Sequence, residues 1–192
     1  VDYSQKKVNH TDKNNKMPIA FWCDEGCIGT ATVNNFFTNV GQAVGYEVSS
    51  GGVIASNIIE SSGAGINVMG SDKVKIYNNT ISRTFRPINI GEDKRAKGCN
   101  AYDTNKKCIS GEKWSQSQKL SWDTTGTQLY NNIISSRLTV QNDSSGPYWA
   151  YPIRTIGADN LDGSAKLYSN DLFEGMDYDA FYRSSPQAEP YV

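Results

Sequence analysis

The sequence has no apolar run long enough to cross a membrane, because none approaches the roughly 18 residues that a spanning helix needs. It also lacks an excess of charge, since 19 basic and 20 acidic residues leave a formal net charge of -1. This balance gives no electrostatic basis for binding nucleic acid or an anionic membrane. The first residues, Val1 to Lys7, are polar rather than signal-like. We expect a soluble protein, either processed or a fragment, that binds neither nucleic acid nor membrane.

Long stretches of the helix formers Leu, Ala, Glu and Lys are also missing. Asn, Gly, Ser, Thr and Tyr are plentiful instead, and this composition favours β-strands and turns. A hydrophobic fraction of 38% over 192 residues is enough for one folded domain with a thin core. We therefore expect a single all-β domain over residues 1–192.

Histidine is nearly absent, and His10 is the only one. The four cysteines form two local pairs, Cys23 with Cys27 and Cys99 with Cys108. Zinc sites usually need more histidine or Cys-x-x-Cys spacing, so the pairs favour disulfides in an oxidising compartment, with zinc as the alternative. A bridge from Cys23 to Cys27 requires a turn that brings their α-carbons within about 7 Å. The expected location is secreted or at the cell surface.

An internal repeat determines the expected fold. Four segments share β-branched or aromatic residues, then Asn, then more apolar residues: Thr32–Phe37, Ile54–Ile59, Ile76–Ile81 and Leu129–Ile134. Their asparagines are Asn35, Asn57, Asn79 and Asn132, with differences of 57 − 35 = 22, 79 − 57 = 22 and 132 − 79 = 53 residues. We interpret 53 as two periods plus an insertion of nine. Weaker copies begin at Asn9 and at Leu167, the latter with Asn170.

Each repeat also contains a preceding strand pattern, as in Ala43–Val48, Gly65–Met69 and Pro87–Gly91. Units this small cannot bury their own apolar faces, so they must stack in parallel, about 4.8 Å apart. We predict one column of Asn35, Asn57 and Asn79 that hydrogen-bond along the stack at left-handed turns. The frames of leucine-rich repeats and β-propellers are absent. The expected fold is a right-handed parallel β-helix, a solenoid with coils of about 22 residues and one inserted loop at 97–121.

The coils at Phe21–Gly26, Gly45–Ser50 and Val74–Thr80 resemble those of the pectate-lyase-like superfamily, in particular bacterial parallel β-helix repeat proteins. The resemblance covers residues 8–95 well and 122–173 more loosely. It implies a secreted, carbohydrate-active protein that acts on a polysaccharide or oligosaccharide. Lyases of this superfamily often use Ca²⁺ with a basic residue, but no close match to their catalytic motifs is present.

Two carboxylates fall on adjacent coils of the predicted stack. Asp24 aligns with Glu47 if the turn after Asp24 holds one extra residue, and otherwise Glu25 takes that place. Carboxyl groups about 5 Å apart are typical of retaining glycosidases, in which one is the nucleophile and the other the acid/base. Proximity raises the pKa of one of them unless a cation intervenes. This chemistry needs no cofactor. Alternatively, the acidic groups bind Ca²⁺ with nearby carbonyls, or are solvated surface residues.

Basic residues follow the same column further along the chain. The run after Gly91 contains Asp93, Lys94 and Arg95, which are candidates for substrate binding. Arg83 and Arg86 could bind the carboxylate of a uronate, and Lys94 or Arg95 could remove a proton beside it, as in a lyase or epimerase. The alternative is a set of ordinary surface charges.

Aromatic residues near the turns suggest a sugar-binding surface, because flat rings stack on sugar faces. The candidates are Trp22, Tyr46 and Trp149. The inserted loop could form a wall beside them.

The sequence therefore predicts glycoside hydrolysis as the leading function. A polysaccharide lyase or epimerase is the second possibility, and a non-catalytic glycan-binding or surface/spike module is the third. Without capping helices at its ends, the solenoid could also associate with other copies of itself.

Overall fold

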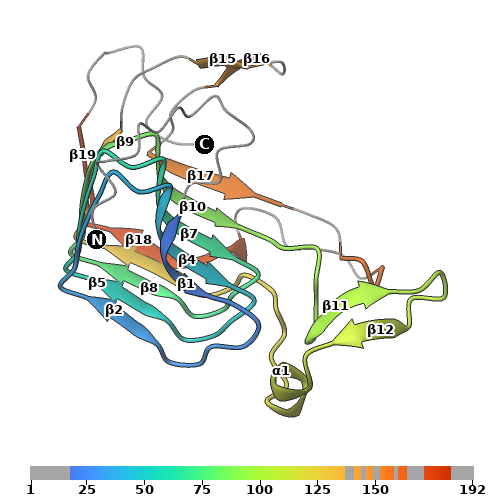
Figure 1. The fold of residues 1–192 in the computed structure, drawn as a ribbon. Coiled ribbons are helices and arrows are strands. Elements are labelled where there is room, and N and C mark those ends of the chain that lie inside the picture. The colour runs from blue at the N-terminus through green and yellow to red at the C-terminus, as the bar shows by residue number, and fades with distance from the viewer. Residues whose placement is uncertain are drawn as a thin grey trace.

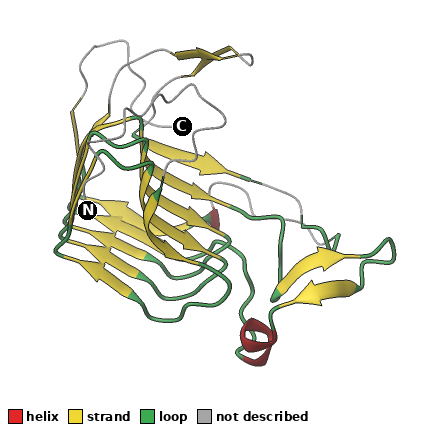
Figure 2. Cartoon of the chain, viewed as in Figure 1, coloured by secondary structure: helices red, strands yellow, loops and turns green. Residues whose placement is uncertain are grey.

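The computed structural model describes residues 18–136, 141–143, 146–148, 152–157, 160–163 and 171–182. Nearly all of its regular structure is β (Figure 2), and the helix that it contains, α1, is only the five residues Lys113–Ser117. In this part of the chain no helix is long and apolar enough to cross a membrane. The prediction of an all-β protein is confirmed.

Three five-stranded sheets, all with parallel pairing, make up the body of the protein (Figure 1). The first sheet contains β1 (Ile19–Cys23), β4 (Gln42–Glu47), β7 (Ala64–Met69), β10 (Arg86–Gly91) and β17 (Ile153–Ile156). The second contains β2 (Ala31–Val33), β5 (Val53–Ala55), β8 (Lys75–Tyr77), β13 (Thr127–Tyr130) and β18 (Phe173–Asp177). The third contains β3 (Phe36–Thr38), β6 (Ile58–Glu60), β9 (Thr80–Thr84), β14 (Ile133–Ser136) and β19 (Ala180–Tyr182).

The chain visits the three sheets in turn and then returns to the first, one strand further along. We call each passage through the three sheets a rung. The described residues form five rungs, from β1–β2–β3 to β17–β18–β19. This arrangement of parallel sheets is compatible with a parallel β-helix.

Columns of apolar side chains fill the space between the sheets. In the second sheet Ile54 pairs with Ile76, and Ile76 pairs with Leu129. These side chains, like the column Ile59, Ile81 and Ile134 of the third sheet, are 0 to 1% exposed. Burial of one such side chain stabilises the fold by about 1.5–3 kcal/mol. The alternation of inward and outward residues thus explains why the central residue of each short strand is the buried one.

The predicted asparagine column is confirmed. Asn57 Oδ1 accepts hydrogen bonds from the backbone N–H and the side-chain Nδ2 of Asn35, both at 3.0 Å. Asn79 Oδ1 accepts the same two hydrogen bonds from Asn57, and Asn132 Oδ1 accepts them from Asn79. The left-handed backbone, however, lies one residue earlier than expected, at Asn34, Ser56, Asn78 and Asn131, with φ between 53° and 58°. We call the column the asparagine ladder.

Two details of the predicted repeat are wrong. Leu129 pairs directly with Ile76, so the 53 residues between Asn79 and Asn132 are one rung and 53 − 22 = 31 additional residues, not two periods and nine. The last described rung of the ladder holds Asp179, which accepts from Asn132, where the sequence predicted Asn170. Asn170 and the first predicted copy at Asn9 lie outside the described residues.

The additional residues between β10 and β13 form a separate projection (Figure 1). It contains the antiparallel pair β11 (Cys99–Tyr102) and β12 (Cys108–Gly111), followed by α1. A disulfide joins Cys99 to Cys108, with α-carbons 5.9 Å apart, as the sequence predicted. A second small antiparallel pair joins β15 (Gln141–Asp143) to β16 (Gly146–Tyr148).

Replacement of Asn57 by Leu is expected to destabilise the protein by about 1 to 3 kcal/mol, because it leaves buried donors and acceptors of both neighbouring rungs without partners. Denaturant unfolding measures the loss. The control is Asn105→Leu in the exposed turn between β11 and β12, which should change stability by less than about 0.5 kcal/mol. An unchanged stability of the Asn57 variant would contradict a structural role for the ladder.

The disulfide between Cys99 and Cys108 should be detectable in protein purified without reductant. We expect the two cysteine-containing peptides to remain linked in non-reducing peptide mapping by mass spectrometry and to separate after reduction. Its loss in a Cys99→Ser/Cys108→Ser variant should cost the inserted segment on the order of 2 to 3 kcal/mol, because the closed loop is short. Recovery of both cysteines as free thiols would contradict this prediction.

Candidate functional site

The candidate site lies where the first sheet meets the turn that follows it. Beneath it runs a second polar column, in which backbone N–H groups donate to hydroxyl oxygens. Cys27 N–H donates to Ser49 Oγ, Ser49 N–H to Ser71 Oγ, and Ser71 N–H to Thr124 Oγ1, at 3.0 to 3.2 Å. The hydroxyl column fixes the position of each turn relative to the next. Sequence reasoning missed it, although the 22-residue separation of Ser49 and Ser71 is a signal of the same kind as the asparagines.

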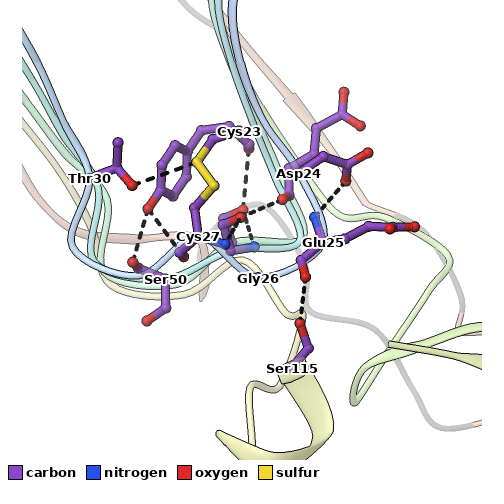
Figure 3. The surroundings of a disulfide bond; sticks show 12 residues. Cys23, Asp24, Glu25, Gly26, Cys27, Thr30, Ser50 and Ser115 are labelled. Carbon is purple, nitrogen blue, oxygen red and sulfur yellow. Dashed lines mark hydrogen bonds between the residues drawn. A yellow bond between two sulfur atoms is a disulfide. The ribbon is translucent and has the colours of Figure 1, made fainter. Parts of the chain in front are cut away.

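A disulfide closes the first of these turns (Figure 3). The α-carbons of Cys23 and Cys27 are 5.9 Å apart, within the limit for a bridge, and the predicted disulfide is confirmed. Between them Glu25 has a left-handed φ of 57°, and its N–H donates to Asp24 Oδ1 at 2.9 Å. The turn therefore holds the Asp24 side chain at the end of β1.

The register of the first sheet decides which acidic residue lies beside Glu47. Trp22 pairs with Gly45, and Cys23 pairs with Tyr46, so Asp24 and Glu47 are the next residues on neighbouring strands. Ile28 pairs with Ser50, which places one extra residue in the turn after Asp24. The prediction with this extra residue is correct. The alternative that places Glu25 in the column is wrong.

Arg95 connects the two carboxylates. Its Nη1 lies 3.5 Å from Asp24 Oδ1, and its Nη2 lies 3.4 Å from Glu47 Oε2. Asp93 binds the same guanidinium through both carboxylate oxygens, at 2.8 Å to Nε and 3.1 Å to Nη2. The Arg95 guanidinium also lies 5.8 Å from the centre of the buried Trp122 ring, within range of a cation–π interaction. The side chains of the four charged residues remain 20 to 27% exposed.

The two carboxyl groups differ in what acts on them. Burial is the main cause that raises the pKa of Asp24, and Arg95 is the next largest influence and opposes it. Burial also raises the pKa of Glu47, but there the charge of Asp24 adds to the effect before Arg95 opposes it. Like charge therefore adds to the effect of burial on the pKa of Glu47, whereas the largest electrostatic influence on Asp24 is the opposing cation.

The inserted projection holds the turn from the other side. Ser115 Oγ donates to the Glu25 carbonyl at 2.8 Å (Figure 3), and Trp114 Nε1 donates to the Gly26 carbonyl at 3.1 Å. The side-chain amide of Asn100 donates to Glu25 Oε1 at 2.9 Å. A Cβ atom at Gly26 would lie 3.0 Å from the Trp114 ring, so this close approach requires glycine. Glu25 thus connects the turn to the projection.

The aromatic candidates have different surroundings. Trp22 is 55% exposed and lies over Gly45, two residues before Asp24 in the chain, and its exposure is what a sugar-stacking residue requires. Tyr46 is only 1% exposed, and its hydroxyl donates to the Ser50 carbonyl at 3.0 Å. The prediction that Tyr46 contacts a glycan is wrong, because its position in β4 points into the core. Trp149 lies outside the described residues.

The predicted basic residues are only partly brought together. Arg86 begins β10, at the opposite end of that strand from Gly91, and its guanidinium lies 5.6 Å from the Phe85 ring centre. Arg83 is in the third sheet and forms an ion pair with Glu60. Neither is among the charges that act on Asp24 or Glu47, and their binding of a uronate carboxylate stays a prediction. Lys94 is exposed, and its carbonyl accepts a hydrogen bond from the N–H of Leu161 at 2.9 Å.

In the described part of the chain no group of three or more His, Cys, Asp and Glu side chains could hold a metal ion. At the candidate site the positive charge between the acidic groups is the Arg95 guanidinium. No protein-family model, curated protein or solved structure matches this chain. The arrangement of the residues is therefore the basis of any functional assignment.

Replacement of Arg95 by Gln is expected to raise the pKa values of both Asp24 and Glu47 further, because Arg95 lowers each of them. Carboxyl NMR titration measures both values. A raised folded-state pKa means that the folded state holds its proton more tightly than the unfolded state, so the associated stability is lost as pH rises through that pKa. The Arg95 variant should therefore lose more stability than the wild type on going from acidic to neutral pH.

The matched control for Arg95 is Lys94→Gln, which removes the adjacent exposed cation. Lys94 is not among the charges that act on either carboxyl, so both pKa values should stay as in the wild type. Equal shifts in the two variants would contradict the assignment of Arg95 as the bridging group.

Proposed function

We propose that this chain is a right-handed parallel β-helix with coils of about 22 residues. The parallel pairing of every strand in the three main sheets supports this fold, as do the 22-residue separations in both polar columns. The right-handed sense follows from the strong preference of parallel strands for right-handed connections. The pectate-lyase-like superfamily is the class of solenoid that its coils resemble.

On this scaffold we propose a secreted glycoside hydrolase that cleaves a polysaccharide or oligosaccharide. The observation that carries the proposal is the location of Asp24 and Glu47 on adjacent strands, where one guanidinium reaches both carboxylates. Strands in a sheet are about 4.8 Å apart, close to the carboxyl separation of retaining enzymes. The two disulfides are compatible with a secreted protein.

The proposed roles follow from the electrostatics of the pair. Glu47, whose pKa is raised by burial and by Asp24, donates its proton to the glycosidic oxygen. Asp24, whose raised pKa is opposed most strongly by Arg95, acts as the nucleophile, and its ionised form attacks the anomeric carbon. The Glu47 carboxylate then takes a proton from water, which hydrolyses the glycosyl intermediate and regenerates both groups. Trp22 provides the apolar surface for the neighbouring sugar ring.

The local charge favours a neutral glycan over a uronate. Asp24, Glu47 and Asp93 surround the single guanidinium of Arg95, which is bound to all three. A uronate carboxylate would meet repulsion there, and Arg83 and Arg86 lie too far along the fold to compensate. Hydrolysis is therefore better supported than lyase or epimerase chemistry.

A second candidate function is non-catalytic glycan binding. The observation that favours it is the ion-pair network itself, since an Arg95 that binds three carboxylates also serves as a structural connection between β1, β4 and the segment after β10. In that case the acidic residues stabilise the connection between these strands, and Trp22 binds the glycan without bond cleavage.

The test is the turnover of Asp24→Asn and Glu47→Gln variants on neutral plant, algal and bacterial glycans, followed by the release of reducing sugar. Each variant should lose about 10²- to 10⁴-fold in rate, because a carboxamide neither attacks carbon nor exchanges the proton. Glu60→Gln, which removes the carboxylate that pairs with Arg83, is the control and should keep the rate. Binding of a glycan without any product from the wild type would favour the non-catalytic function.

A further inference from the structure

The asparagine ladder ends, in the described residues, on an aspartate. Ile133 pairs with Ala180, so Asp179 occupies the position that Asn132 occupies one rung earlier. Asp179 Oδ1 accepts from the N–H and the Nδ2 of Asn132, at 2.7 and 2.8 Å. These are the same two bonds that each ladder asparagine accepts from its neighbour. The Asp179 carboxyl therefore has the orientation of the carboxamides that it replaces.

The other half of each ladder carboxamide makes a second, constant contact. Asn57 Nδ2 donates to the Thr32 carbonyl at 2.8 Å, and Asn79 Nδ2 donates to the Ile54 carbonyl at 2.9 Å. Asn132 Nδ2 continues the series to the Ile76 carbonyl at 3.0 Å. Leu129 pairs with Ile76 in the next rung, so the Leu129 carbonyl is the equivalent acceptor for residue 179.

At residue 179 this contact cannot form in the ionised state. The atom that replaces the donating nitrogen is Oδ2, which is buried and has no hydrogen-bond partner in the described structure. An ionised carboxylate is only an acceptor and would face another acceptor, whereas a protonated carboxyl has an O–H donor. We propose that Asp179 completes the ladder in its protonated form, with Oδ2–H donating to the Leu129 carbonyl. Ionisation of Asp179 then weakens the pairing of β19 with β14.

The surroundings of Asp179 support this state. Burial is the main cause that raises its pKa, the hydrogen bonds from Asn132 oppose the increase, and the charge of Asp177 adds to it. The adjacent strands β13, β14 and β19 carry no Lys, Arg, Asp or Glu, and their titratable groups are the tyrosines Tyr130 and Tyr182. In β18 the charged residues are Glu174 and Asp177. None of these groups is a cation that would stabilise the carboxylate.

The protonated state of Asp179 determines the direction in which stability changes with pH. Because the pKa of Asp179 is raised on folding, its contribution to stability is complete below the unfolded value and is lost as pH rises through the folded value. This is the reverse of the usual behaviour of an aspartate bound to a cation. The effect should be local, and it should weaken the pairing of β19 with β14, where Ala180 N–H donates to the Asn132 carbonyl at 2.7 Å.

Carboxyl NMR titration of the wild-type chain tests the proposal directly. Asp179 should titrate above the ordinary aspartate value of about 3.9. The matched variant is Asp179→Asn, whose amide is a donor at every pH. At pH values above the pKa of Asp179, the Ala180 amide should exchange with solvent at least about five times more slowly in this variant than in the wild type. At pH values below that pKa the two rates should be equal.

Asp177→Asn is the control, because it keeps Asp179 and its burial but removes a charge that adds to the increase in its pKa. It should move the titration of Asp179 to lower pH and leave a pH-dependent Ala180 exchange rate. A wild-type Asp179 that titrates at or below about 3.9 would overturn the proposal. Faster Ala180 exchange in Asp179→Asn at every pH would overturn it as well. Neither result depends on the glycosidase function.

Discussion

Hydrogen bonding between stacked rungs is the constraint on which the rest of this structure depends. Each rung is a few short strands and turns, and the turns are where backbone groups would otherwise remain unpaired. A buried donor or acceptor without a partner costs about 1–3 kcal/mol. The hydroxyl column supplies side-chain oxygens at the turn between the first and second sheets, and the asparagine ladder does so between the second and third, so each rung depends on its neighbour. The sheets and the core follow from that stacking.

Both polar columns meet a carboxyl group where the repeat changes. The asparagine ladder reaches Asp179 in the fifth rung. In the hydroxyl column, Thr124 N–H donates at 2.8 Å to Oε1 of Glu92, which is 2% exposed. A carboxyl oxygen replaces an amide or hydroxyl oxygen as an acceptor without difficulty. Its second oxygen brings a different requirement, which only the surroundings of each carboxyl can meet.

Much of the fold could be predicted from the sequence, because equal spacing of Asn35, Asn57 and Asn79 is a direct record of stacking. The 53-residue step could not be interpreted correctly, since a count of residues does not reveal whether the chain adds a rung or leaves the stack.

The hydroxyl column gives a weaker signal in the sequence than the asparagines, because serine is common and Thr124 follows the insertion. The prediction that Tyr46 contacts a glycan failed because of the alternation of side chains along a strand. Its place next to Glu47 in the sequence puts it on the opposite face of the strand, in the core.

The candidate site depends on contacts that no spacing could reveal. Register places Asp24 beside Glu47, but the cation between them comes from Arg95, 48 residues beyond Glu47. The turn that carries Asp24 is held by Ser115 and Trp114, about 90 residues away in the chain. The contacts of Arg95 and those of Ser115 and Trp114 arise because the chain leaves the stack after β10 and folds back on the first rung. The insertion that obscures the repeat in the sequence is thus also what brings a guanidinium and a support to the two carboxylates.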